Sequence, residues 1–228
     1  MNSIKLDLHL HTCYSGDSLI KPKDLLKQAV KKGLNGFAIT DHGSLKAYKS
    51  LEKTASKRGL IVIPGMEIET HIGEVIALFI DEEFKIRDNN FISIVEKIKE
   101  LNGLIVIPHP FDFLRTNHLK TSLLSEKIVR KYIDGIEIVN SRIVFNSCIR
   151  KAKKYNERFK LFETGGSDAH TLKEIGTGYT FIKNVSGLTL DDIFKALKFG
   201  NTVSCGKLSS PLVHAKTIFN KLQKGLYF

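Results

Sequence analysis

The chain has 228 residues, which is enough for one domain with a full hydrophobic core. Its 35 lysine and arginine residues against 24 acidic residues give a net charge of +11, which favours phosphate-bearing partners such as nucleotides, RNA or DNA, or else a solvated basic surface. No apolar run reaches the ~18 residues of a membrane helix, and three widely separated cysteines exclude a disulfide framework and fit a reducing cytoplasm.

The first predicted element is a strand over residues 4–11. Because alternate side chains of a strand share a face, Asp7, His9 and His11 should point one way and the leucines between them the other. Two imidazoles on one face can bind a single metal ion, although a lone His-x-His pair indicates this only weakly. Asp17 follows in a polar loop, where it is either a further ligand reaching back or an ordinary turn aspartate.

Helical and strand patterns alternate along the rest of the chain. Apolar residues at helical spacing predict helices at residues 22–32, 44–58, 88–101, 121–132, 143–156, 189–199 and 211–224. Short buried runs predict strands at residues 37–40, 60–64, 74–80, 103–107, 135–139, 159–164, 179–182 and 201–204. This alternation is typical of a parallel α/β architecture, and polar residues that follow its strands should meet at one face.

Residues suited to metal binding gather at the ends of these strands. Together with the N-terminal pair they form one set: His9, His11, Asp17, His42, Glu67, His109, Asp168 and His170. Glu69 shares a face with Glu67 and competes with it, whereas His109 stands between two prolines whose stiff backbone would hold a ligand in place. Imidazole and carboxylate together suit Zn, Mn or Fe. Eight ligands are too many for one tetrahedral ion, so two or three ions sharing a bridging carboxylate are expected.

These motifs resemble those of the PHP (polymerase and histidinol phosphatase) family. The matching segments are Asp-Leu-His-Leu-His-Thr at 7–12, Ile-Thr-Asp-His at 39–42, Gly-Met-Glu at 65–67, Pro-His-Pro at 108–110 and Gly-Ser-Asp-Ala-His at 166–170. The resemblance implies an α/β fold, a distorted (β/α)7 TIM-like barrel with a metal cluster at its carboxyl-terminal face. It also divides the chain into a PHP metal-dependent hydrolase domain at 1–183 and a short PHP-associated C-terminal α/β segment at 184–228.

Carried over position by position, the resemblance implies ligands for up to three divalent ions. The first ion would be held by His9, His11, Glu67 and Asp168, the second by Glu67 and His109, and the third by Asp17, His42 and His170. Family members with three full sites use one more ligand after the strand that corresponds to 135–139. This chain has Glu137 and Asn140 there and no His, so the resemblance leaves two or three ions open.

The activity that the resemblance implies is phosphoester hydrolysis by metal-activated water. The residues expected to carry the reaction are Glu67, Asp168, His170, Arg115 and Arg142. Either arginine could clamp a phosphate as a bidentate fork, and the alternative for each is a surface salt bridge. Similarity to small stand-alone PHP phosphoesterases implies a phosphorylated small molecule or nucleotide as substrate, with short RNA or DNA as a further candidate and the cytoplasm as the compartment.

Other functions fit the same residues. A histidinol-phosphate-type phosphatase is the runner-up, because the family includes that enzyme. A non-catalytic PHP subunit of a polymerase or RNA-processing complex would keep the basic surface while losing ligands, and the eight competent ligands argue against it. Amide or lactone hydrolysis could use the same metal platform. His71 and His118 are either donors of a proton to the leaving group or solvated loop residues.

Overall fold

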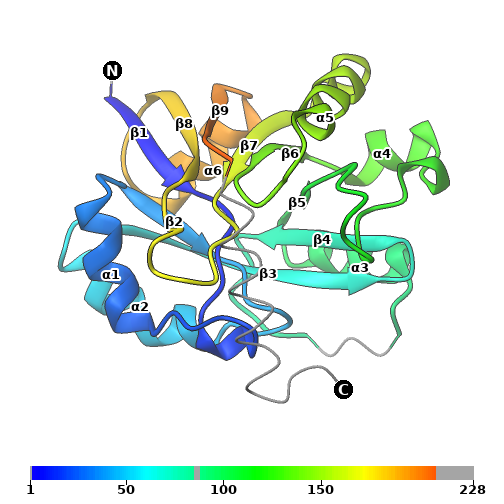
Figure 1. Ribbon diagram of the computed structural model, residues 1–228. Helices are drawn as coiled ribbons and strands as arrows, with labels where there is room; N and C mark the ends of the chain where they lie inside the picture. Colours follow the sequence, from blue (N-terminus) through cyan, green and yellow to red (C-terminus); the bar gives the residue numbers. More distant parts are fainter. Residues whose placement is uncertain (1, 85–87, 209–228) are drawn as a thin grey trace.

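The computed structural model describes residues 2–84 and 88–208, and Figure 1 shows how they fold. Within them one sheet of nine strands has the spatial order β7-β6-β5-β4-β3-β2-β1-β8-β9. The strands are β1 (Asn2–Asp7), β2 (Gly36–Ile39), β3 (Ile61–Thr70), β4 (Gly73–Leu78), β5 (Leu104–Ile107), β6 (Gly135–Asn140), β7 (Phe162–Gly166), β8 (Gly178–Val185) and β9 (Thr202–Gly206). Most strands that are consecutive in the chain are therefore neighbours in the sheet.

Two of these strands run against the others, so the expected parallel arrangement holds for only part of the sheet. β4 pairs antiparallel with both β3 and β5, and β8 pairs antiparallel with both β1 and β9. The remaining contacts between neighbouring strands are parallel, so the other seven described strands end at one face. The expectation failed at β4 because β3 extends to Thr70 and β4 begins at Gly73, and so tight a connection can join only antiparallel strands.

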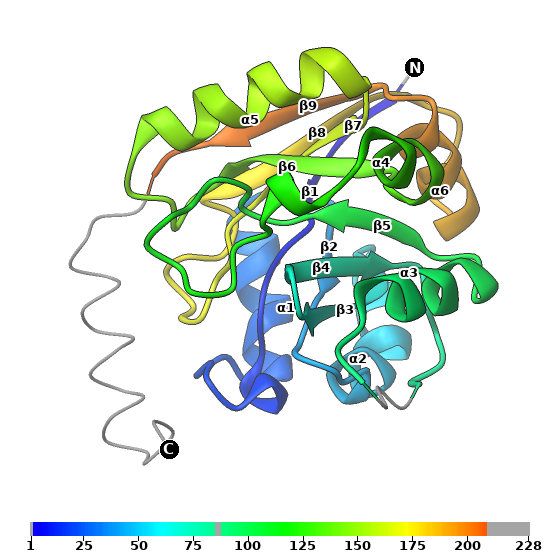
Figure 2. The same cartoon turned by 90° about the vertical axis from the view of Figure 1, so that its right-hand side faces the viewer.

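The sheet curls until its two ends nearly meet (Figures 1 and 2). The backbone NH of Gly165 on β7 donates to Thr180 Oγ1 on β8 at 2.9 Å. Gly178 of β8 lies so close to β7 that a Cβ atom there would stand 2.1 Å from the carbonyl oxygen of Gly166. The nearly closed sheet confirms the predicted distorted barrel.

Helices surround this sheet in Figure 2. They are α1 (Pro22–Lys31), α2 (Lys46–Ser56), α3 (Phe91–Glu100), α4 (Glu126–Tyr132), α5 (Asn146–Phe159) and α6 (Leu190–Lys198). In α1, proline occupies the first turn, where its missing NH has no cost. Its buried side holds Leu25, Leu26 and Ala29, as the helical spacing predicts. A separate buried cluster draws alternate residues from the strands, including Leu6 of β1, Ala38 of β2 and Ile63 of β3.

Most predicted elements occur within a few residues of their expected bounds. Besides the extension of β3 to Thr70, there are two local differences. β1 ends at Asp7 rather than at residue 11, and Leu10 then makes an isolated parallel bridge with Ala169. The helix expected at 121–132 starts only at Glu126, because Ser125 caps it by accepting a hydrogen bond from a backbone NH of the first turn. A short 3-10 turn, Thr121–Leu123, precedes it.

The C-terminal expectations are only partly covered by the described residues. The helix predicted at 211–224 lies outside them. The boundary expected between residues 183 and 184 falls inside β8, and the division into two domains stays a prediction. Within the described part of the chain, no helix is both long enough and apolar enough to cross a membrane.

Candidate metal centre

Two pairs of candidate ligands meet where β1 and β7 end. His9 and His11 follow β1, and Asp168 and His170 follow β7. The backbone NH of Asp168 donates to the carbonyl oxygen of His9 at 2.7 Å, and the NH of His11 donates to the carbonyl oxygen of Ala169 at 3.0 Å. These bonds join the segments that follow β1 and β7, two strands that are not neighbours in the sheet, and hold the two pairs of candidate ligands side by side.

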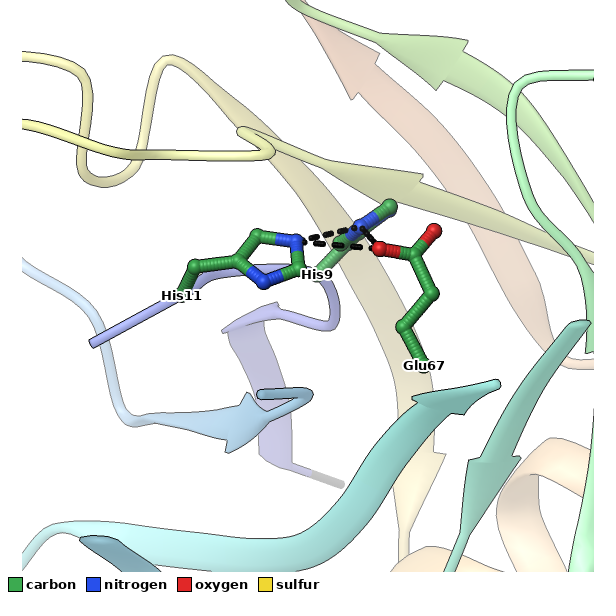
Figure 3. A group of neighbouring side chains, drawn as sticks. All are labelled: His9, His11 and Glu67. Carbon is green, nitrogen blue, oxygen red and sulfur yellow. Dashed lines mark hydrogen bonds and ion pairs between the residues drawn. The ribbon is translucent and has the colours of Figure 1, made fainter. Parts of the chain in front are cut away.

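Four donor atoms from this region and β3 converge on one point. His9 Nε2 lies 3.2 Å from His11 Nε2 and 3.4 Å from Glu67 Oε2. His11 Nε2 lies 3.2 Å from Glu67 Oε2 and 3.5 Å from Asp168 Oδ1. Figure 3 shows the side chains of His9, His11 and Glu67 pointing toward one another. His9 Nε2 lies farther from Asp168 Oδ1, at 3.8 Å. Ligands at about 2.0–2.2 Å from a tetrahedral zinc ion stand about 3.3–3.6 Å apart, so the spacing of His9, His11 and Glu67 is close to that around one metal ion.

The electrostatics of this group also fit a cation. Asp168 Oδ1 is buried and accepts no hydrogen bond, which is costly for a carboxylate unless a cation is bound. Burial alone would lower the pKa of His9, but the carboxylates of Glu137, Glu67 and Asp168 raise it well above its ordinary value. The group therefore gathers more negative charge than the neutral imidazoles can balance.

Glu137, on β6, orients His9 and was given no role in the sequence analysis. Its Oε1 lies 3.1 Å from His9 Nδ1. Because a carboxylate only accepts, Nδ1 carries the proton and Nε2 turns its lone pair toward the centre. Glu137 Oε2 accepts from the backbone NH of His109 at 2.8 Å and from Asn140 Nδ2 at 3.0 Å. The sequence does carry a signal for this role of Glu137. It is an acidic residue inside an otherwise apolar strand, and a buried carboxylate needs a polar partner.

A second group forms around His109 and contains Glu74, which the sequence analysis missed. His109 Nε2 lies 3.2 Å from Glu67 Oε1 and 3.4 Å from Glu74 Oε2. Both carboxylates come from the β3–β4 hairpin, in which Glu69 is paired with Glu74 but is exposed. Burial and the negative charge of Glu67 raise the pKa of Glu74 to about 8. Two buried carboxylates this close need a positive partner to stay ionised together.

A third group lies at the solvent side and contains Asp17, His42 and His170. His170 Nε2 lies 2.9 Å from Asp17 Oδ2, and His42 Nε2 lies 3.8 Å from the same oxygen. His170 Nδ1 lies 2.9 Å from the carbonyl oxygen of Asp168, so both ring nitrogens of His170 face acceptor oxygens. The side chain of His42 is 39% exposed, which makes this group the most open of the three.

Two of the candidate ligands have unusual backbone conformations. His109 has a φ angle of 28° and Asp168 a φ angle of 52°. Positive φ is uncommon for residues other than glycine, and such residues cluster at functional sites. In His109 the flanking prolines restrict the backbone on both sides, which agrees with the expectation of a ligand held by a stiff frame.

Both predicted arginines line a pocket of about 540 Å³ above the ligands. Arg115 pairs with Asp168 through Nη2 and with Asp112 through Nε at 3.1 Å. Arg142 is buried, and its Nε makes no hydrogen bond, since Glu174 Oε1 is 3.7 Å away. Both arginines therefore have carboxylate partners, Arg115 with a partly exposed side chain and Arg142 with a buried one.

Three other polar residues from the N-terminal and loop segments are engaged elsewhere. Asp7 shares the first strand with the histidines, but its carboxylate accepts from the backbone NH groups of two residues near β7 and β8. His71 Nδ1 accepts from the backbone NH of Phe91 at 3.1 Å, at the start of α3. His118 Nδ1 donates to the carbonyl oxygen of Arg115 at 2.7 Å. These contacts hold loops in place around the pocket.

Comparisons with known proteins agree with the geometry. The sequence matches the PHP domain over residues 7–162 and the PHP-associated family over residues 149–202. It is 34% identical over 192 residues to an uncharacterized protein of Methanocaldococcus jannaschii, covering 83% of this chain and 75% of that protein. A two-domain protein of Bacteroides vulgatus containing a predicted PHP-like metal-dependent phosphoesterase superposes with a TM-score of 0.77 at 18% identity, over 96% of this chain and 70% of the other. A lesion-specific endonuclease of Pyrococcus furiosus superposes with a TM-score of 0.65 at 19% identity, over 90% of this chain and 59% of the other.

Proposed function

The chain belongs to the PHP family, and on that premise we propose that it is a metal-dependent phosphoesterase acting on a nucleotide or on short RNA or DNA. The observation that carries the proposal is the convergence of His9, His11, Glu67 and Asp168, with one buried Asp168 oxygen that accepts no hydrogen bond. The net charge of +11 supports a polyanionic substrate. A structural neighbour that is an endonuclease supports the same substrate class.

The residues present fit two or three divalent ions, which we take to be Zn, Mn or Fe. His9, His11, Glu67 and Asp168 would hold the first ion, and Asp17, His42 and His170 the third. For the second ion we propose Glu67, His109 and Glu74. Glu74 would replace the ligand that is missing after β6, where Glu137 and Asn140 instead support the residues around them. Such ions, when bound, lower the pKa of a coordinated water and neutralise phosphoryl oxygens.

The chain's own residues would position the substrate. Arg142 lines the pocket, and its guanidinium would donate to a phosphate oxygen of the substrate. Arg115 is tied to Asp168 and Asp112, so it fixes the orientation of Asp168 and leaves less of its guanidinium for substrate. Glu67 lies between the first two groups and keeps them at a constant separation.

Metal content measured beside hydrolysis tests this proposal. The purified protein should carry two or three ions per chain by elemental analysis and should hydrolyse phosphomonoesters, nucleoside bisphosphates or short 5′-phosphorylated RNA, with loss of activity on chelation. Metal-loaded protein that bound RNA tightly but hydrolysed none of these would support a non-catalytic subunit instead. Turnover confined to histidinol phosphate would support the runner-up substrate.

The Glu74→Gln variant tests the second ligand group. We expect it to lose one ion per chain after dialysis, because the amide cannot supply the negative charge that His109 and Glu67 leave incomplete. Glu69→Gln is the matched control, since Glu69 is directly paired with Glu74 in the hairpin but exposed. Unchanged metal content in Glu74→Gln would remove Glu74 from the site.

A further inference from the structure

Two phenylalanine rings stack against each other at the surface. Phe113 lies on the loop after β5 and Phe145 lies just before α5, with ring centroids 5.3 Å apart and ring planes 15° from parallel. They are 57% and 44% exposed. Large apolar side chains that are grouped and exposed often mark a binding surface. A pair of stacked rings in solvent offers further flat faces on which another ring can stack.

The stacked pair adjoins the candidate metal centre. The loop that carries Phe113 begins just after His109, and the loop that carries Phe145 contains Arg142. The chain neighbours of the two rings, Leu114 and Val144, line the pocket that holds the ligands. In Figure 2 both loops leave the sheet at the same end. The two rings therefore lie beside the pocket that contains the candidate ligands.

Phe113 also borders a second, smaller hollow of about 250 Å³. Lys120 and Lys151 line this hollow, and both are exposed. Among the described residues that line it, none is acidic. A flat apolar ring beside two ammonium groups matches the two parts of a nucleotide, a base that stacks and a phosphate that carries charge.

We propose that the Phe113–Phe145 pair is a stacking platform for a base of a nucleotide or of a single-stranded nucleic acid. Lys120 and Lys151 hold the adjacent phosphate of the strand. This inference rests on the proposed phosphoesterase function, which places a phosphate of the substrate at the metal centre. The base-binding subsite that it assigns is separate from that centre. The platform contacts the flat face of a base, which all bases have, and therefore binds strands of different sequence. This suits an enzyme that processes strands without sequence preference.

Binding without hydrolysis tests the platform directly. A 5′-phosphorylated single strand containing 2-aminopurine is titrated with the full chain in a chelator, and stacking is read as quenching of the base fluorescence. Phe113→Ala should weaken binding about 5- to 150-fold and abolish quenching, since a base–aromatic stack is worth about 1–3 kcal/mol. Phe113→Tyr should retain both. Phe199→Ala is the matched control, because Phe199 is 79% exposed but lies at the end of α6.

The lysines are tested by the salt dependence of the same binding. Lys151→Gln should lower the slope of log affinity against log salt by about 0.7, the value for one phosphate contact on a single strand. Lys154→Gln, an exposed lysine on the same helix that does not line the hollow, should leave the slope unchanged. Equal slopes for the two variants would remove Lys151 from the subsite.

Hydrolysis with three substrates separates the platform from the reaction. In metal-loaded protein, Phe113→Ala should raise KM for a 5′-phosphorylated strand and for a nucleoside monophosphate, but not for ribose 5-phosphate, which has no base. An effect on the strand alone would support a platform for the second nucleotide. Quenching that survives Phe113→Ala, or an equal effect on all three substrates, would overturn the proposal. A further outcome is that Phe113→Ala abolishes quenching while the metal-loaded wild-type protein hydrolyses none of the substrates. That result would support the platform and refute the phosphoesterase function.

Discussion

Replacing Glu137 with glutamine would test whether a buried carboxylate sets the protonation of His9. Glutamine keeps the shape of the side chain but turns one acceptor oxygen into a donor NH2 group. Glu137 Oε2 already accepts from His109 N at 2.8 Å and from Asn140 Nδ2 at 3.0 Å and lies 3.3 Å from His9 Nδ1, whereas Oε1 is the oxygen nearest to His9 Nδ1 at 3.1 Å. The amide oxygen should therefore take the Oε2 position, and its NH2 group would face His9.

The consequence is a change of tautomer in His9. With a donor as the nearest neighbour of Nδ1, the tautomer with its proton on Nε2 is favoured. Nε2 is the nitrogen that lies 3.2 Å from His11 Nε2 and 3.4 Å from Glu67 Oε2. A protonated nitrogen cannot bind a metal ion. Loss of such a supporting carboxylate typically costs about 10- to 100-fold in metal affinity, which corresponds to about 1.4–2.7 kcal/mol.

Zinc titration of metal-free protein, in competition with a chromophoric chelator, measures this affinity. Glu163→Gln is the matched control, because Glu163 is a partly buried carboxylate on the neighbouring strand β7 that accepts from Ser204 Oγ at 3.1 Å, away from the ligands. The control should bind zinc like the wild type. A Glu137→Gln protein with wild-type zinc affinity and an unchanged melting curve would refute the role assigned to Glu137.

Three further predictions concern stability. Saturating metal should raise the free energy of unfolding by about 2.7 kcal/mol at a concentration 100 times Kd, measured by thermal melting with and without chelator, and an unchanged Tm would contradict metal binding to the folded chain. Gly178→Ala should destabilise the barrel and lower the midpoint of urea unfolding, because its Cβ would stand 2.1 Å from the carbonyl oxygen of Gly166; an unaltered midpoint would show that β7 and β8 can separate freely. Thr189→Ala should cost about 1 kcal/mol through loss of the capping box with Asp192, whereas Thr189→Ser should cost much less in the same urea titration.

The sequence predicted the parts of the centre that follow from strand periodicity. His9 with His11 and Asp168 with His170 are each two residues apart, and parallel strands end at a common face, so pattern alone places these pairs together. The structure brings all eight predicted residues into neighbouring groups. To predict that these residues lie near one another, only the direction of the strands had to be known, and no individual long-range contact.

Glu74 and Glu137 could not be found in the same way. Glu74 stands at the start of a strand, and in a purely parallel sheet that position is at the end opposite to the ligands. It reaches His109 only because β4 is reversed. The role of Glu137 depends on a contact with His9 across 128 residues, and periodicity carries no information about such a contact.

The joint between the ends of β1 and β7 also sets when the centre can form during synthesis. Asp7 and Ser167, which flank the two ligand pairs and are hydrogen-bonded to each other, are 160 residues apart in the chain. At 5–20 residues per second, a ribosome needs roughly 8–30 s to make the segment between them. During that interval His9 and His11 exist as an incomplete pair, without the carboxylate of Asp168. On the proposed function, tight metal binding would therefore require a closed barrel, and loading of the metal would mark the completion of folding.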